Sequence, residues 1–276
     1  MLKLKCNECG GPLRRSGGEY ACENGHIYPA SPEGYIEFIG KDAESDHEGD
    51  SPEIVQSKHD FLDKGYYATL SEAVGDTGLR LLKLCPSPAV IVDCCCGEGH
   101  YTRSLLRELK KAEAEAEVLA FDLSREAVAL AAKQGGGALY AHADVYDMPL
   151  ADDSVDLALN CFGPVPDAGM ARILKPGGLL ISVIPGRMHL YAMKTALFDL
   201  PVVVDESGHA SKIMTRVKQI RVRDKIVLSE LEDLKNLFMM TPEMAREGAY
   251  YFEKLKGLQD LEIETDFILQ IFRKPK

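Results

Sequence analysis

The sequence predicts a doubly wound α/β domain that follows a small, zinc-ribbon-like module at the N-terminus. Three observations predict this fold class. Short apolar runs alternate with helical patterns from Pro88 onward, a glycine turn and an acidic residue follow two successive runs, and four cysteine and histidine residues lie within the first 26 positions. Strand–helix alternation at this spacing indicates a parallel sheet that is covered on both faces.

Composition and charge narrow the class of protein. The chain has 276 residues, of which 46% are hydrophobic and 27% charged, which is typical of globular proteins. No run approaches the roughly 18 consecutive apolar residues of a membrane span, and no apolar signal segment opens the chain, so we expect a cytoplasmic location. The formal net charge of −11 means that a local basic patch must bind any RNA partner.

The first 40 residues have the ligand spacing of a zinc module. Cys6 and Cys9 form a Cys-x2-Cys knuckle, and Cys22 with His26 completes a Cys3His set. Because protein then fills all four positions of a tetrahedral site, we expect the zinc to be structural. A segment this short has too little core to fold alone, so the metal would supply the folding free energy. The alternative is a pair of incidental cysteines beside a surface histidine.

A polar segment follows the module. Residues 41–53 are rich in Asp, Glu, Ser and Gly and carry almost no apolar side chain, which is typical of a linker. The sequence therefore divides into a zinc-binding module at 1–40, a linker at 41–53 and a larger domain at 54–276.

The larger domain is predicted to alternate strands and helices. Asp93, Asp122 and Asp144 fall at the ends of its first three strands, and ligands of such sheets bind beyond the carboxyl ends of the strands. Ser124 is the predicted N-cap of the second helix. The predicted strands are 89–92, 118–121, 139–142, 155–160 and 179–184, and the helices run to about Lys111 and over 125–133.

A nucleoside cofactor is predicted at this edge. The Gly97-x-Gly99 turn lets the backbone pass close to a ligand, where a Cβ would collide. Asp122, on the next strand, is placed to accept two hydrogen bonds from a ribose diol. The loop lacks the Gly-x-Gly-x-x-Gly and Gly-Lys-Ser/Thr patterns, which disfavours NAD and nucleoside triphosphates. The alternative is that Asp93 and Asp122 merely cap the following loops.

Three segments of the larger domain resemble class I S-adenosylmethionine (SAM)-dependent methyltransferases. They are Val-Ile-Val-Asp-Cys-Cys-Cys-Gly-Glu-Gly-His-Tyr-Thr at 90–102, Phe-Asp-Leu-Ser at 121–124 and Leu-Lys-Pro-Gly-Gly at 174–178. Together with the zinc module, they resemble bacterial 23S rRNA (guanine-N1)-methyltransferases of the RlmA type. Further matching segments, at 49–53, 61–67, 185–190, 240–242 and 265–267, extend the resemblance over nearly the whole chain.

The resemblance implies a Rossmann-like fold, SAM as methyl donor and a homodimer that methylates N1 of a guanine in a 23S rRNA hairpin. An aromatic face such as Tyr67 can stabilise the sulfonium charge, and His189 can hydrogen-bond the amino-acid carboxylate. The alternative for Tyr67 is that it is a core aromatic residue, and the alternative for His189 is that it caps the loop. Asp122 would bind the ribose and Asp144 would face the adenine edge. The residues implied to bind SAM are Tyr67, Gly97, Glu98, Gly99, Asp122, Asp144 and His189.

The target base and the first motif add two further expectations. A flipped base could stack and be bonded at Asn160, Phe162 and Pro164, after the fourth strand. No residue is singled out as the base that removes the N1 proton. Cys95 replaces the first glycine of the family's Gly-Cys-Gly-x-Gly motif, so its Cβ would crowd the methionine end or require a shifted backbone angle.

A basic stripe is the predicted RNA contact, although an ordinary solvated face is the alternative. Two other functions stay open, a small-molecule SAM-dependent methyltransferase, which the acidic net charge favours, and a non-catalytic RNA-binding relative, which Cys95 suggests. Alternation through the stripe indicates a strand. The stripe consists of Lys212, Arg216, Lys218, Arg221, Arg223 and Lys225, offset only by Asp224.

Overall fold

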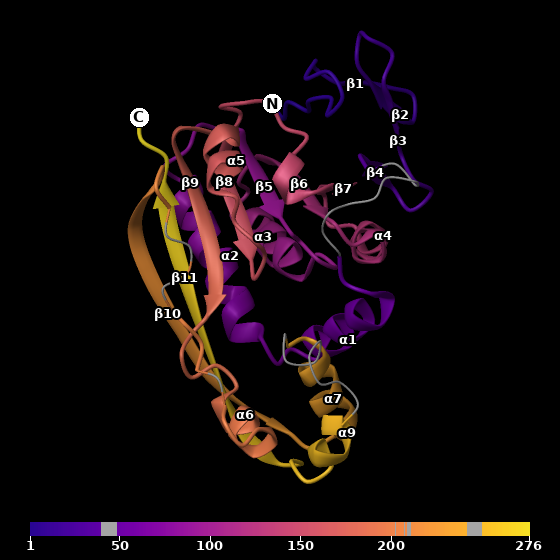
Figure 1. Ribbon diagram of the computed structural model, residues 1–276. Coiled ribbons are helices and arrows are strands. Elements are labelled where there is room, and N and C mark those ends of the chain that lie inside the picture. Colours follow the sequence, from indigo (N-terminus) through magenta and orange to yellow (C-terminus); the bar gives the residue numbers. More distant parts are fainter. Residues whose placement is uncertain (40–48, 202, 207, 209–210, 242–249) are drawn as a thin grey trace.

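The computed structural model describes residues 1–39, 49–201, 203–206, 208, 211–241 and 250–276. Most of the predicted linker, at 41–48, lies outside the described residues. At the centre is an eight-stranded sheet in the order β10-β11-β9-β8-β5-β6-β7-β4 (Figure 1). A separate three-stranded sheet belongs to the N-terminal module, which we call the finger; its strands are β1 (Arg14–Ser16), β2 (Glu19–Ala21) and β3 (Ile27–Pro29).

The five predicted strands are confirmed as β5 to β9. Four of them are longer than predicted, by one or more residues at one or both ends. The six neighbouring strands from β4 to β9 are all parallel. The bounds are β4 (Tyr35–Glu37), β5 (Ala89–Cys94), β6 (Ala116–Asp122), β7 (Leu139–His142), β8 (Val155–Cys161) and β9 (Leu174–Pro185).

Beyond these parallel strands, the sheet ends in an antiparallel pair. The predicted basic strand is β10 (Thr215–Leu228), and it pairs with β11 (Leu261–Arg273), which is antiparallel to both β10 and β9. The last residue of β10, Leu228, pairs with the first residue of β11, Leu261, so β11 runs back along β10.

Helices cover one face of the sheet more fully than the other. Leu70 of α2 and Leu105 of α3 pack with Leu157, Ile181 and Leu269 in one core cluster. Ser51 caps α1, which begins at Pro52, inside the predicted linker. The helices are α1 (Pro52–Asp63), α2 (Ala68–Leu82), α3 (His100–Lys111), α4 (Arg125–Gln134), α5 (Asp167–Ile173), α6 (Tyr191–Leu197), α7 (Leu231–Met239) and α9 (Tyr250–Leu255).

The finger covers part of the opposite face. Leu4, Cys6 and Tyr28 belong to one buried cluster with Val92 and Phe121 of the sheet. Between β7 and β8, a stretch described in full, the chain forms only the 3-10 turn η1 (Val145–Asp147) instead of a crossover helix. A two-sided sheet must cover both faces, so we infer that the finger fills the place of that helix.

Beyond the carboxyl ends of the parallel strands, α6, α7 and α9 form a lobe in the lower part of Figure 1, with α7 directly below α1. Tyr66, just after α1, donates a hydrogen bond of 2.6 Å to Asp233 of α7, which ties the two together. Within the described ranges, no helix is long and apolar enough to cross a membrane.

Candidate cofactor pocket and metal centre

A pocket of about 570 Å3 lies at the carboxyl ends of the parallel strands, where the sequence predicts the cofactor. Loops that follow β5, β6, β7, β8 and β9 form its walls, and residues of α1 and α7 contribute on the far side. Six of the seven predicted cofactor residues line it, and Gly99 does not. The six are Tyr67, Gly97, Glu98, Asp122, Asp144 and His189.

The two glycines of the first loop have different roles. Gly97 has φ +56° and open space where a Cβ would point, so its backbone conformation is what favours glycine there. Gly99 is the N-cap of α3 with φ +83°, and a Cβ on it would lie 3.1 Å from the Ala131 Cβ and 3.3 Å from the Tyr140 hydroxyl. Gly99 therefore allows α3 to begin close to α4 and β7, away from the pocket.

Asp122 both caps the loops and faces the pocket. Its Oδ2 accepts a hydrogen bond from the Gly97 amide and its Oδ1 one from the Ser124 amide, each at 2.8 Å. Burial raises the pKa of this carboxyl, and the two amides offset part of the rise. Each oxygen can accept a second hydrogen bond, so both of the predicted readings are compatible with the geometry.

Glu98 presents a buried carboxylate at the pocket wall. Its side chain is 3% exposed, and Oε2 is paired with the Arg103 guanidinium at 2.7 Å. The other oxygen, Oε1, has no hydrogen-bond partner among the described residues. A buried acceptor without a partner is costly, so a ligand that donates a hydrogen bond at this position would fit it.

Aromatic rings form the opposite wall. The Phe267 ring lies 4.9 Å from that of Tyr67, 4.5 Å from that of His189 and 5.7 Å from that of Phe162, centroid to centroid. Burial, with help from the nearby Lys194, lowers the pKa of His189 to about 3, so its ring is neutral near pH 7. The Asp266 amide donates to His189 Nδ1 at 3.4 Å, which leaves the hydrogen on Nε2.

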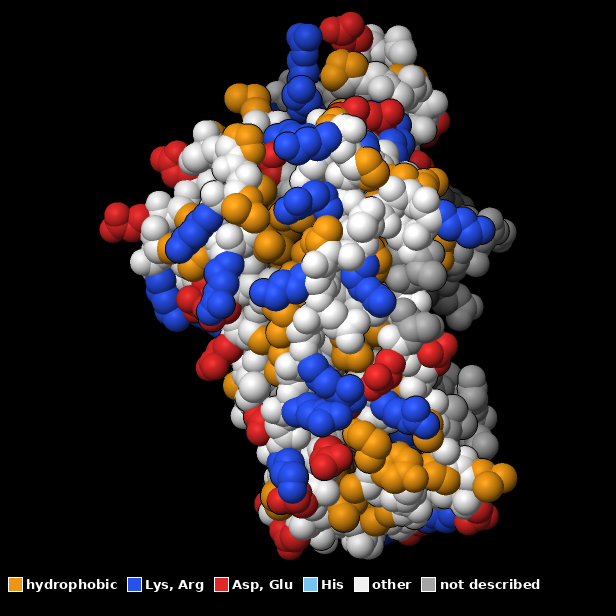
Figure 2. All heavy atoms as spheres, turned by 90° about the vertical axis from the view of Figure 1, so that its left-hand side faces the viewer, with side chains coloured by type: hydrophobic (Ala, Val, Ile, Leu, Met, Phe, Trp, Pro, Cys, Tyr) orange, Lys and Arg blue, Asp and Glu red, His pale blue; other side chains and the backbone are white. Residues whose placement is uncertain are grey.

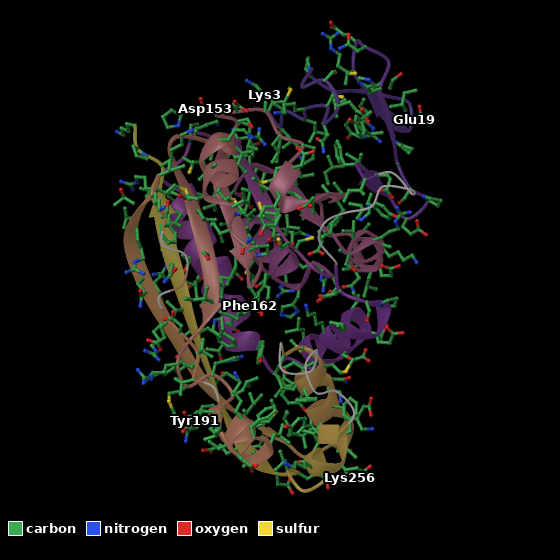
Figure 3. All side chains as sticks on the ribbon, viewed as in Figure 1. Lys3, Glu19, Asp153, Phe162, Tyr191 and Lys256 are labelled. Carbon is green, nitrogen blue, oxygen red and sulfur yellow. The ribbon has the colours of Figure 1, made fainter. Side chains whose placement is uncertain are left out.

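Of the three predicted base-binding residues, Asn160 lies in β8, and Phe162 and Pro164 lie in the loop that follows it. Asn160 is buried, and its amide donates a hydrogen bond of 3.0 Å to the Pro164 carbonyl. Phe162 and Pro164 line the pocket, whereas Asn160 does not and instead holds the loop through this hydrogen bond. Phe162 is 45% exposed and lies at the lower ends of the strands, facing the lobe (Figure 3).

Cys95 has the shifted backbone angle that the sequence predicts. Its φ is +63°, a left-handed conformation that costs a non-glycine residue roughly 1–2 kcal/mol. Gly163 provides the space for its side chain, because a Cβ on that glycine would lie 2.5 Å from the Cys95 Cβ. The loop after β8 therefore makes room for the Cys95 side chain.

The predicted metal ligands converge on one point. The ligand atoms of Cys6, Cys9, Cys22 and His26 all lie within 4.8 Å of one another. His26 Nδ1 is 3.4 Å from the Cys6 sulfur and 3.5 Å from that of Cys22, and the sulfurs of Cys9 and Cys22 are 3.7 Å apart. A tetrahedral zinc site has S–N edges of about 3.5 Å and S–S edges of about 3.8 Å, given Zn–S and Zn–N bonds of about 2.3 and 2.0 Å. The residues therefore fit zinc.

Tyr28 supports this cluster from outside. Its hydroxyl accepts a hydrogen bond from the Asn7 amide at 3.0 Å and lies 3.1 Å from the Cys6 sulfur. With the lone pair engaged, the hydroxyl hydrogen can point to that sulfur, which is the kind of contact that orients a metal ligand.

The basic stripe is only partly available to a partner. Figure 2 looks onto the β10 edge and shows Lys and Arg side chains along its length. Arg221 and Arg223 are paired with Asp266, and Lys225 with Glu262. Among the described residues, the side chains of Lys212, Arg216 and Lys218 form no ion pair; all three are exposed.

These features together define a class I SAM-dependent methyltransferase fold, with a glycine loop on the first parallel strand, an acidic residue on the second and one antiparallel strand near the edge. A family described as "Methyltransferase domain" matches residues 91–178.

Two relatives narrow the class. The chain is 31% identical to "23S rRNA (guanine(748)-N(1))-methyltransferase" of Streptomyces fradiae, over 96% of this chain and 95% of that one. It is 27% identical to "Putative 23S rRNA (guanine-N(1)-)-methyltransferase" of Micromonospora griseorubida, over 77% and 76% of the two chains. The chain belongs to the family of 23S rRNA (guanine-N1)-methyltransferases.

Two parts of the site were not predicted from the sequence. Phe267 lies at the centre of the aromatic wall, and only the Thr-Asp-Phe segment at 265–267 carried a signal for it. Asp50 and Lys58 also line the pocket, from the end of the predicted linker and from α1. Asp50 lies in the matching segment 49–53, which carried no signal for a pocket residue, and Lys58 lies in a polar stretch outside the matching segments.

Proposed function

We propose that this protein transfers the methyl group of SAM to N1 of a guanine in a 23S rRNA hairpin. The observation that carries the proposal is that one pocket is lined both by Asp122, at the end of β6, and by the partly exposed ring of Phe162, in a chain of this family. Such a role would place the protein in the cytoplasm.

In this proposal, SAM spans the pocket from Asp144 to the aromatic wall. Asp122 would accept both ribose hydroxyls, and Asp144 would face the adenine edge. Glu98 Oε1 would accept a hydrogen bond from the amino group of the methionine part. His189 would donate from Nε2 to its carboxylate, and Tyr67 would face the sulfonium. When bound, SAM supplies an activated methyl group, so the protein mainly needs to align the acceptor.

The target guanine would enter between the lobe and the loop after β8. Phe162 offers a partly exposed ring on which a flipped base can stack, and Pro164 extends that apolar surface. Asn160 would contribute indirectly, through its hydrogen bond to the Pro164 carbonyl, rather than by contact with the base.

We propose that zinc occupies the Cys6, Cys9, Cys22 and His26 cluster and is structural. The support is the tetrahedral spacing of four protein ligands, which leaves no position for a reacting water. The metal would stabilise the finger, which packs on the sheet.

RNA contacts would come from Lys212, Arg216 and Lys218, the three stripe cations without an ion pair in the described part of the chain. An approaching phosphate need not break an existing ion pair to reach them. A homodimer, as the family resemblance implies, would double this surface.

The test uses purified protein, SAM with an isotopically labelled methyl group and a synthetic 23S rRNA hairpin containing guanine 748, the nucleotide named for the Streptomyces fradiae relative. We expect label on guanine N1, found by digestion and mass spectrometry, and none when that guanine is replaced by adenine. Label that appears only on an added small acceptor would instead support a small-molecule methyltransferase. Tight SAM binding without label on any 23S rRNA fragment would support a non-catalytic relative.

A further inference from the structure

We propose that Asp266, held by Arg221, is a positioning residue that fixes the 186–189 loop so that His189 faces the cofactor pocket. The inference rests on the proposed function, because it assigns the pocket to SAM. Its evidence is a set of contacts between β10, β11 and the loop after β9.

The first part of the evidence is the ion pair itself. Asp266 is 0% exposed, and Arg221 approaches it with both Nε and Nη2, at 2.8 Å from Oδ1 and 2.5 Å from Oδ2. Arg223 Nε adds a third contact at 3.3 Å. Burial alone would raise the pKa of this carboxyl, but the arginines and the Met188 amide outweigh it and the pKa is lowered. Asp266 is therefore a buried anion whose charge depends on its partners.

The second part is the number of loop contacts that this one residue makes. The Asp266 carbonyl accepts from the Gly186 amide at 2.7 Å, its Oδ2 accepts from the Met188 amide at 3.1 Å, and its own amide donates to His189 Nδ1. Gly186 allows this approach, because a Cβ there would lie 2.6 Å from the carboxylate. The loop is thus attached to Asp266 at its two ends and in its middle.

The third part explains why Arg221 is needed. Glu206 accepts from the Arg187 amide at 2.6 Å and from Arg221 Nη2 at 2.7 Å. Arg221 therefore lies between two carboxylates that both hold the same loop. If Arg221 were lost, these two negative charges would face each other with only Arg223 nearby, and the buried one would be left without its bidentate partner.

The consequence for the pocket follows from the next residue of β11. Phe267 contacts the His189 ring at 4.5 Å, while the Asp266 amide sets which nitrogen of that ring carries the hydrogen. Movement of the 186–189 loop would displace His189 from both contacts. Asp266 itself does not line the pocket, so its effect on SAM would pass through His189.

The experiment measures binding of S-adenosylhomocysteine to the full chain by calorimetry, without RNA. We expect Asp266→Asn and Arg221→Gln each to weaken binding by about tenfold or more, and the double variant to be no weaker than the worse single, because the two residues act as a unit. Asp266→Asn added to His189→Ala should have little further effect. Glu262→Gln, which removes an exposed ion pair on the same strand and face, is the control and should bind like wild type.

A pH profile separates positioning from general loss of stability. Asp266 faces Arg221 and Arg223 of β10 and the His189 loop, with Glu206 beyond Arg221. In wild type its lowered pKa keeps it charged across about pH 5–8, so this residue adds no acid sensitivity. In Arg221→Gln its pKa rises, and the affinity relative to wild type should fall progressively as the pH drops from about 8 to 5. Arg221→Lys, which keeps the charge, should restore much of the flat profile.

Four results would overturn the proposal. Unchanged affinity in Asp266→Asn, or additive losses without the pH effect, would reduce the ion pair to a structural role. A loss of RNA binding alone in Arg221→Gln would instead make Arg221 an RNA contact. Failure of the wild type to bind the ligand would refute the proposed function as well, whereas normal wild-type binding with unaffected variants would refute only the positioning role.

Discussion

The two sides of the molecule are built in different ways. On the finger side, which comprises the finger, β4, β6 and β7, the important residues are neighbours in the sequence, such as Cys22 with His26 and Asp122 with Ser124. On the hairpin side, which comprises β9, β10, β11 and the 186–189 loop, they are distant: Arg221 and Asp266 are 45 residues apart, and Met188 and Asp266 are 78. Spacing along the sequence therefore reveals the important residues of the finger side, whereas those of the hairpin side are revealed only by the folded structure.

The largest effect is expected at the finger. Cys22→Ser should remove one of four ligands, so bound zinc should fall from about one per chain to a small fraction, as measured by atomic emission. SAM affinity should also fall, because Asn7 donates to the Asp147 carbonyl and the finger therefore packs on the segment that carries Asp144.

Cys85→Ser is the matched control, because Cys85 is partly buried but lies outside the metal cluster. Metal loss with unchanged SAM affinity would show that the proposed 1–40 module is independent of the pocket. Full zinc content in Cys22→Ser would contradict the ligand assignment.

The next effect is expected at Asp122. Asp122→Ala removes the acceptor of the ribose diol and the cap of the Gly97 and Ser124 amides, so the Kd for SAM should rise by about 10- to 100-fold, or ~1.4–2.7 kcal/mol. Calorimetry measures this, with Asp76→Ala on the exposed face of α2 as a control. An unchanged Kd would mean that Asp122 is only a loop cap.

On the hairpin side, we expect a smaller effect, a loss of RNA binding that depends on salt concentration. Neutralising Arg216 and Lys218 together should weaken RNA binding and reduce the slope of log K against log salt by about 2. Neutralising Lys225 should have less effect, because Glu262 already pairs with it at 2.6 Å. Filter binding at several salt concentrations checks both, and equal losses would show that ion pairing does not decide which cations bind RNA.

The smallest effect is expected at Cys95. Glycine would relieve the left-handed conformation at this position, worth roughly 1 kcal/mol, but would lose the contact of the side chain with Gly163. We expect the melting temperature and the SAM affinity of Cys95→Gly to stay close to those of wild type. A gain in affinity of tenfold or more would mean that the cysteine obstructs the cofactor.

The features that the sequence predicts correctly are mostly local, and the features that it misses depend on distant segments. The strands from 89 to 184 and the convergence of Cys6, Cys9, Cys22 and His26 were predicted, because periodicity and ligand spacing are local properties. The antiparallel return of β11, the buried Asp266 and the packing of the finger on the sheet were not. Each depends on which distant segments meet, and a single sequence does not contain that information in its local pattern. Gly99 shows the same limit, since its neighbours Ala131 and Tyr140 come from other elements.

The most direct test is a crystal structure of the protein with S-adenosylhomocysteine, with anomalous data collected at the zinc edge. The account predicts one anomalous peak among Cys6, Cys9, Cys22 and His26, and in the same molecule a ribose bonded to Asp122 with the methionine part beside His189. A metal-free cluster, or a cofactor bound away from the carboxyl ends of the strands, would contradict it.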